Sequence, residues 1–184
     1  MKRFRLVLAV LPVFLVLATA FGAAAQSPDT SSRFNTNDEE PEAWSELENV
    51  QPPAFPGDDS LLEIYVSPIA TNKYFVDTAS LSIEGDGVVR FVLVVKTAGG
   101  ATNVSFEGMH CATRRWKHYA TGRSDKTWTI SRAARQEWRP IENKPTNPHH
   151  AVLSRSFFCP QGYPITSADD GRNALRLGRH PNSI

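Results

Sequence analysis

The chain has 184 residues, of which 41% are hydrophobic, 21% charged and 10% aromatic, and its formal net charge is +1. With 11 glycines, 13 prolines and two cysteines, the composition is typical of one ordinary globular domain. It excludes a collagen-like repeat, a coiled coil, a multi-span membrane protein and a disulfide-dense mini-protein.

The first 25 residues have the pattern of a cleavable secretory signal. Lys2, Arg3 and Arg5 precede an uncharged apolar run over 6–21, and small residues at 23–25 suit a signal peptidase. A retained anchor is the alternative, because the run approaches the length that crosses a bilayer. Cleavage is favoured by Pro12 and by the polar sequence that follows. We therefore expect a periplasmic mature chain without a transmembrane span.

Residues 26–60 predict an acidic, proline-containing N-terminal arm ahead of a single domain at 61–178 and a C-terminal tail at 179–184. A short helix over 41–47 is possible within the arm. Trp44, Leu47 and Phe55 are candidates to hold the arm on the domain. Its carboxylates are candidates to pair with basic residues further along the chain.

The domain begins with segments in which apolar and polar residues alternate at the period of a β-strand. Gly85-Asp86-Gly87 separates two of them and predicts a hairpin, because tight turns need residues that adopt positive φ. The expected strands cover residues 61–66, 79–83, 88–96, 104–109, 115–120 and 127–130.

Helices are expected after the strands. Ser131 predicts the cap of a short helix through Trp138, and Asn147-Pro148 predicts the start of a helix towards Phe158. A last helix over 167–177 carries acidic residues in its first turn and Arg176 in its last turn. The predicted fold class is α+β, an antiparallel meander sheet of about five to six strands with C-terminal helices.

The two cysteines of an exported chain predict one disulfide, between Cys111 and Cys159. The alternative is a reactive thiol with a histidine as its base, which export disfavours because the thiol must be reduced. The candidate bases are His110, His118, His149 and His150.

No local motif for a cofactor, a metal or a catalytic nucleophile is found, and none of these is expected. His149 and His150 are adjacent, so on a helix they point in different directions and suit one metal ion poorly. Glu107 lies in an expected strand. It is either a general acid or, as we expect, the partner of a cross-strand arginine such as Arg90 or Arg114.

Basic residues crowd the stretch 114–139, with aromatic residues between them. Such a band could bind an anionic polymer or a lipid headgroup. Alternatively, these residues only form the solvent-exposed face of strands. Arg114, Arg115 and Lys117 are the candidate docking residues. Export argues against nucleic acid as the partner.

Several motifs resemble the cryptic neisserial protein-like family, which comprises uncharacterised, secreted-type proteins of Gram-negative bacteria. The resemblance covers roughly Tyr74 to Cys159 and leaves the acidic arm outside. An arginine often precedes the first cysteine of that pattern, where this chain has His110, so the resemblance implies no essential chemistry for His110. It implies a compartment and domain limits but no activity. The motifs are Tyr74-Phe75-Val76-Asp77, Asp86 to Phe91, Asn103 to Gly108 ahead of Cys111, Tyr119 to Gly122, Trp128 and Phe157-Phe158-Cys159.

Two functional classes lead, and a metal-carrying accessory protein is a third possibility. The first is a binding or accessory module that docks an envelope protein or an anionic envelope component. The second is a hydrolytic or transfer enzyme with dispersed groups, for which the candidates are Glu107, His110, His118 and His149. An enzyme should bring at least two of these groups into one concave pocket, whereas a binder should present a continuous charged or aromatic surface.

Overall fold

The structure is a computed structural model that describes residues 44–132, 137–144 and 148–183. Its centre is a seven-stranded antiparallel sheet in the order β1-β2-β3-β4-β5-β6, with β7 paired to the free edge of β5 beside β6. The strands are β1 (Leu61–Ile64), β2 (Lys73–Ile83), β3 (Val88–Lys96), β4 (Thr102–His110), β5 (Arg115–Gly122), β6 (Trp128–Ile130) and β7 (Arg139–Pro140).

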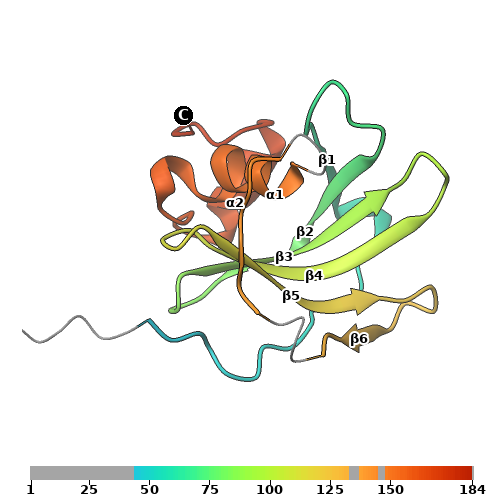
Figure 1. Cartoon of the computed structure of the whole chain (residues 1–184), viewed down its shortest axis with the longest axis horizontal. Coiled ribbons are helices and arrows are strands. Elements are labelled where there is room, and N and C mark those ends of the chain that lie inside the picture. The colour runs from blue at the N-terminus through green and yellow to red at the C-terminus, as the bar shows by residue number, and fades with distance from the viewer. Residues whose placement is uncertain (1–43, 133–136, 145–147, 184) are drawn as a thin grey trace, which may run out of the picture. The chain divides into compact units, whose positions relative to one another are not determined.

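The strands from β1 to β6 pair with their neighbours along the chain, which is the predicted meander (Figure 1). The β2–β3 hairpin turns at Gly87, whose φ of 70° explains the glycine there. Its amide donates a hydrogen bond of 2.9 Å to the Glu84 carbonyl oxygen and closes the turn. The hairpin predicted from Gly85-Asp86-Gly87 is thus confirmed.

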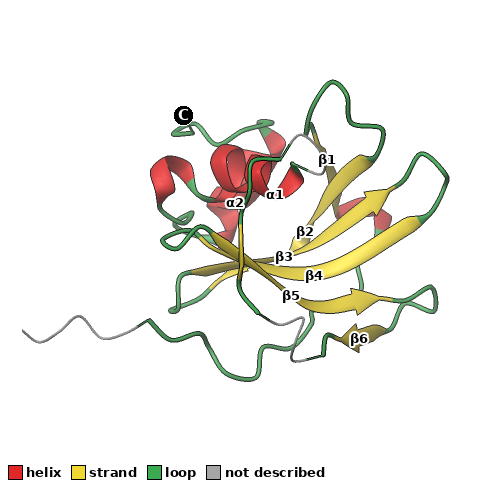
Figure 2. Cartoon of the chain, in the orientation of Figure 1, coloured by secondary structure: helices red, strands yellow, loops and turns green. Residues whose placement is uncertain are grey.

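Helical elements follow the sheet in the chain (Figure 2). Ser167 caps the last helix, because its hydroxyl oxygen accepts a hydrogen bond of 3.1 Å from the Asp170 amide. The expected helix towards Phe158 is present, although most of it is π-helical. The helical elements are η1 (Asp58–Ser60), α1 (His149–Val152), η3 (Leu153–Phe158), η4 (Pro160–Gly162) and α2 (Ala168–Arg176).

The larger core lies between one face of the sheet and the C-terminal helices. Phe91 of β3 meets Phe158 of η3 with ring centroids 5.0 Å apart, and both side chains are fully buried. Gly171 lets α2 approach the sheet closely, since a Cβ there would come within 2.6 Å of Leu81 and Ile165. This face therefore fixes where α1 and η3 sit.

The opposite face carries a smaller core, to which none of the described helices contributes a residue. Residues 44–57, here called the strap, run along this side of the sheet (Figure 1). Phe55 packs against Trp128, with ring centroids 5.3 Å apart, and the Trp128 indole donates to the Pro53 carbonyl oxygen at 2.9 Å. Gly122 makes room for Phe55, because a Cβ at that position would lie 2.8 Å from the ring.

Three details of the predicted elements are wrong. β2 begins at Lys73 rather than Ala79, and a register shift between Asp77 and Ser82 breaks the alternation that marks a regular strand. The described part of the 41–47 segment forms no helix and instead runs along the sheet as part of the strap. The segment 131–138 forms no helix at its described ends, and residues 133–136 lie outside the described residues.

The α+β fold class is confirmed. Within the described ranges, no helix has the length and apolar character to cross a membrane. The predicted signal sequence and residues 26–43 of the arm lie outside the described residues.

Candidate functional site

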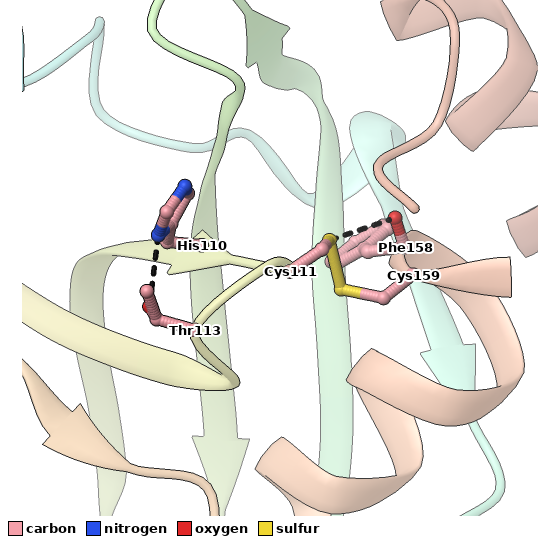
Figure 3. The surroundings of a disulfide bond; sticks show 5 residues. All are labelled: His110, Cys111, Thr113, Phe158 and Cys159. Carbon is pink, nitrogen blue, oxygen red and sulfur yellow. Dashed lines mark hydrogen bonds between the residues drawn. A yellow bond between two sulfur atoms is a disulfide. The ribbon is translucent and has the colours of Figure 1, made fainter. Parts of the chain in front are cut away.

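The first candidate site lies beside the disulfide, which joins the end of β4 to the end of η3 (Figure 3). Cys111 and Cys159 have their Cα atoms 5.5 Å apart and are bonded to each other, as the sequence predicted. Both are almost fully buried, and the chain has no free cysteine. The reactive-thiol alternative is therefore wrong, because each sulfur is held by the other.

A cavity of about 280 Å³ opens next to this bond and is here called the disulfide cavity. The disulfide and the side chains of Ile141 and Ala151 give it apolar walls. Its size is near the lower end of the range for small-molecule sites. The other lining residues are polar, charged or glycine, namely Arg114, Asn143, Ser154, Arg155, Gln161 and Gly162.

Two cationic side chains belong to the lining of the disulfide cavity, Arg114 and Arg155. Both are exposed, and neither forms an ion pair with another described residue. Arg114 has a φ of 50°, a left-handed conformation that costs a non-glycine residue about 1–2 kcal/mol. Strained residues persist where the surroundings hold them, and they gather at binding sites.

The backbone shows what holds Arg114 in place. Its amide donates to the Cys111 carbonyl oxygen at 3.1 Å, and its own carbonyl oxygen accepts from the Ile141 amide at 2.9 Å. The strained turn is thus tied both to the disulfide and to the segment that leads from β7. An anionic group that entered the cavity would meet guanidinium groups from two different elements around an apolar interior.

The second candidate site is a buried carboxylate on the helix-covered face. Glu107 of β4 is only 4% exposed. Its Oε2 lies 2.7 Å from His150 Nε2, and its Oε1 accepts a hydrogen bond of 2.7 Å from Ser105. Burial raises the pKa of Glu107, but His150 and Ser105 outweigh burial and hold it below its ordinary value. Glu107 is therefore ionised at neutral pH.

Aromatic stacking positions both histidines of α1. The His150 ring stacks on Trp116 at 3.8 Å between centroids, and the His149 ring stacks on Tyr74 at 5.0 Å. The Nδ1 atom of His149 is buried without a hydrogen-bond partner in the described chain. Burial, aided by the neighbouring His150, lowers the pKa of His149 to about 4, so this imidazole is neutral at pH 7.

The prediction that an arginine pairs with Glu107 is wrong. In the observed register Glu107 stands opposite Phe91, so the adjacent Arg90 points to the other face of the sheet. There, Arg90 pairs with Asp86 through two hydrogen bonds of 3.1 and 2.5 Å. The second arginine considered, Arg114, belongs to the disulfide cavity.

The four dispersed groups of the enzyme hypothesis do not all meet. Glu107 and His149 gather at α1, together with His150. His110 faces the strap side, where it stacks on Trp44 at 4.1 Å. It also contacts the Thr113 hydroxyl at 2.8 Å (Figure 3). His118 of β5 contacts the hydroxyl of Ser131. None of the four groups is part of the lining of the disulfide cavity.

The predicted docking residues divide between different surroundings. Arg114 and Arg115 are exposed, and Arg115 donates to the Trp138 carbonyl oxygen at 3.4 Å. Lys117 is only 13% exposed, because its Nζ lies 2.7 Å from a carboxylate oxygen of Glu46 in the strap. The pairing of an arm carboxylate with the basic stretch is thereby present in the structure.

The strap is held at its start by polar contacts. The Glu46 carboxylate accepts hydrogen bonds from Lys117 at 2.7 Å, from the Tyr119 hydroxyl at 2.6 Å and from the Trp138 indole at 3.0 Å. Trp44 stacks on His110, as described, and Phe55 packs on Trp128, so two of the three proposed holding residues make such contacts. The third, Leu47, leaves its side chain 41% exposed.

Sequence reasoning missed three of the residues that matter here. Arg155 occurs in an expected helix without any motif, and His150 was considered only as a base for a thiol or as a metal ligand. Glu46 was one carboxylate among many in the acidic arm. A metal site was not expected, and the described ranges contain no group of three His, Cys, Asp or Glu side chains suited to a metal ion.

Comparison with known proteins gives one finding. Searches of curated proteins and of solved structures return no match to this chain. The model of the CNP1-like family matches residues 39–176, which is most of the chain and includes the strap that the sequence resemblance left outside. The matched range also includes the sheet, the disulfide and α2. The chain belongs to the CNP1-like family, the cryptic neisserial protein family that its motifs resemble.

Proposed function

We propose that this chain is an exported binding module of the cell envelope that holds a small amphiphilic carboxylate in the disulfide cavity. The disulfide supports an oxidising compartment such as the periplasm. The signal-like sequence at 1–25 supports export in the same way.

One observation carries the choice of ligand. The disulfide cavity combines apolar walls with two guanidinium groups, Arg114 and Arg155, that lack acidic partners among the described residues. A guanidinium binds a carboxylate with charge-assisted hydrogen bonds, often two at once. The apolar walls favour an alkyl or aromatic group behind that carboxylate. A cavity of about 280 Å³ limits the ligand to a short chain or a single ring.

Octanoate is a suitable probe, because it has one carboxylate and a short alkyl chain. We expect calorimetric titration of the purified mature protein to detect its binding. Replacement of Arg114 or Arg155 by Gln should weaken the affinity about tenfold or more, as the loss of a charged hydrogen bond does. The neutral analogue 1-octanol should bind more weakly than octanoate to the unaltered protein.

Arg123→Gln provides the matched control. It removes the same charge from an exposed arginine that is not part of the cavity lining. Unchanged octanoate affinity in this variant, with a loss in the two cavity variants, supports the proposal. Absence of octanoate binding, or equal effects of all three substitutions, would contradict it.

A further inference from the structure

The start of the strap occupies its site in the manner of a bound peptide. The Trp44 ring stacks on His110 and is nearly perpendicular to the Trp138 ring, with centroids 5.6 Å apart in the second pair. Its indole donates to the Asp86 carbonyl oxygen at 2.8 Å, and the Leu47 amide donates to the Asp86 carboxylate at 3.0 Å. These contacts recognise one aromatic ring and one backbone amide of the strap.

Between those two contacts, the Glu46 carboxylate enters a cluster of three donors, here called the carboxylate clamp. The clamp consists of Lys117 and Tyr119 of β5 and Trp138 just before β7. Burial raises the pKa of Glu46, but the hydrogen bonds from the clamp outweigh burial and keep it below its ordinary value. The clamp therefore selects a charged carboxylate.

The three donors of the carboxylate clamp are suited to binding a charged carboxylate. Burial and the hydrogen bond to Glu46 raise the pKa of Tyr119 far above its ordinary value, so its hydroxyl stays protonated and donates. The Lys117 ammonium also lies 5.3 Å from the centre of the Tyr119 ring and 5.8 Å from that of Trp138. Lys117 and Tyr119 lie in β5, which pairs with β4, so the backbone that carries these two donors is held without the strap.

Little apolar burial holds residues 44–49 in place. Apart from Glu46, each of these residues is exposed, and the side chain of Trp44 is 43% exposed. Val50 and Phe55, which follow, pack against the smaller core. Asn49 has a φ of 56° and marks a turn between the two parts. Residues 44–48 can therefore leave while the rest of the strap stays on the sheet.

An open cavity is present beside the strap. A cavity of about 520 Å³ lies between the strap and the sheet, and its lining includes Glu46, Lys117, Tyr119 and the half-exposed Ile130. An incoming segment could approach the carboxylate clamp along this cavity before residues 44–48 have left completely.

We infer that the carboxylate clamp, with the ring shelf of His110 and Trp138, is a docking site for an acidic segment of a partner protein. The segment carries an aromatic residue two positions before a glutamate, as Trp44 and Glu46 do. The chain's own residues 44–47 are an internal competitor that the partner displaces. This site lies on the strap side of the sheet and is independent of the disulfide cavity.

The test uses a fluorescent peptide with the sequence of residues 42–50 and the full mature protein. A variant with Trp44→Ala and Glu46→Gln weakens the internal competitor. We expect fluorescence anisotropy to show that this double variant binds the peptide at least tenfold more tightly than the unaltered protein does. Adding Lys117→Gln to this variant should abolish binding, whereas adding the control substitution Arg123→Gln should leave it intact.

A peptide without the Glu46 charge tests whether the carboxylate clamp requires that charge. The same peptide with Gln in place of Glu46 should bind at least tenfold more weakly, because the clamp needs a charge. Equal binding of both peptides, or no binding by a folded variant, would overturn the inference. If the double variant fails to fold, Leu47→Pro provides a second way to loosen the strap, since proline lacks the amide that donates to Asp86 and also restricts the backbone of Glu46 before it.

A further outcome concerns self-association. If the unaltered protein forms a dimer in sedimentation experiments and the variant with Trp44→Ala and Glu46→Gln does not, the occupant is a second copy of this chain. That result would overturn the assignment to a partner protein.

Discussion

Glu107 and His150 are 43 positions apart in the chain, yet their side chains meet at 2.7 Å between strand β4 and the first turn of α1. Their side chains are only 5% and 13% exposed, so the Glu107 carboxylate is poorly solvated and depends on its partners in the protein. A buried pair of this kind contributes modestly when complete and becomes costly when one member is removed. The pair therefore ties the position of α1 to the sheet.

The energetic consequence can be measured with a double-mutant cycle. His150→Gln removes the imidazole that meets the buried Glu107 carboxylate, and we expect it to lower the free energy of unfolding by about 1–3 kcal/mol. Combining it with Glu107→Gln removes the unpaired charge and should restore much of that loss. Urea denaturation of the three variants tests this, and additive losses would show that the two side chains act independently.

Acid should destabilise the protein through His149. Its pKa is about 4 in the folded state and lies below the ordinary value of 6.5 in the unfolded chain, so the unfolded state binds the proton more readily. Stability should therefore fall as the pH drops from about 6.5 to about 4, by about 3 kcal/mol from this residue. His149→Phe keeps a ring on Tyr74 and should flatten the profile. Identical pH profiles of denaturation for both proteins would refute this.

Arg114 should show opposite effects on stability and on binding. Arg114→Gly relieves the left-handed backbone at φ 50° and should raise the free energy of unfolding by about 0.5–1 kcal/mol. The same change should weaken octanoate binding at least tenfold. Lys126→Gly is the matched control, because Lys126 has a φ of 62° and is not part of the cavity lining. It should stabilise the protein and leave the affinity unchanged.

Gly108 should be intolerant of even one added methyl group. A Cβ there would lie 2.7 Å from the Tyr119 ring, so we expect Gly108→Ala to cost about 1–3 kcal/mol through overpacking. Gly85→Ala is the control, because a Cβ at that position has nothing within 4 Å. Thermal unfolding should separate the two variants. A stable Gly108→Ala protein would mean that Tyr119 moves away without cost.

The disulfide should account for a large part of the stability. It closes a loop of 48 positions, for which the chain-entropy model gives about 4 kcal/mol. Replacement of both cysteines by Ser should lower the free energy of unfolding by about that amount. Thiol titration of denatured, unreduced protein should find no free thiol, and two free thiols would contradict the pairing.

The sequence predicts the fold better than it predicts the sites. Strands and α2 follow from local patterns, namely period-two alternation and a capping serine, and these survive in the structure. The full length of β2 could not be predicted from the sequence, because the bulge after Asp77 interrupts that alternation. The pairs Glu107–His150 and Glu46–Lys117 could not be predicted by spacing, since each depends on packing between distant elements.

The meander topology also bears on the order in which the protein folds. Hairpins between consecutive strands close short loops and lose little chain entropy, so the sheet from β2 to β5 can assemble early. The contacts of Glu46 with Lys117 and Trp138 span 71 and 92 positions and can form only once β5 and β7 are in place. We therefore expect the start of the strap to be the last part of the described chain to dock during folding and the first to detach.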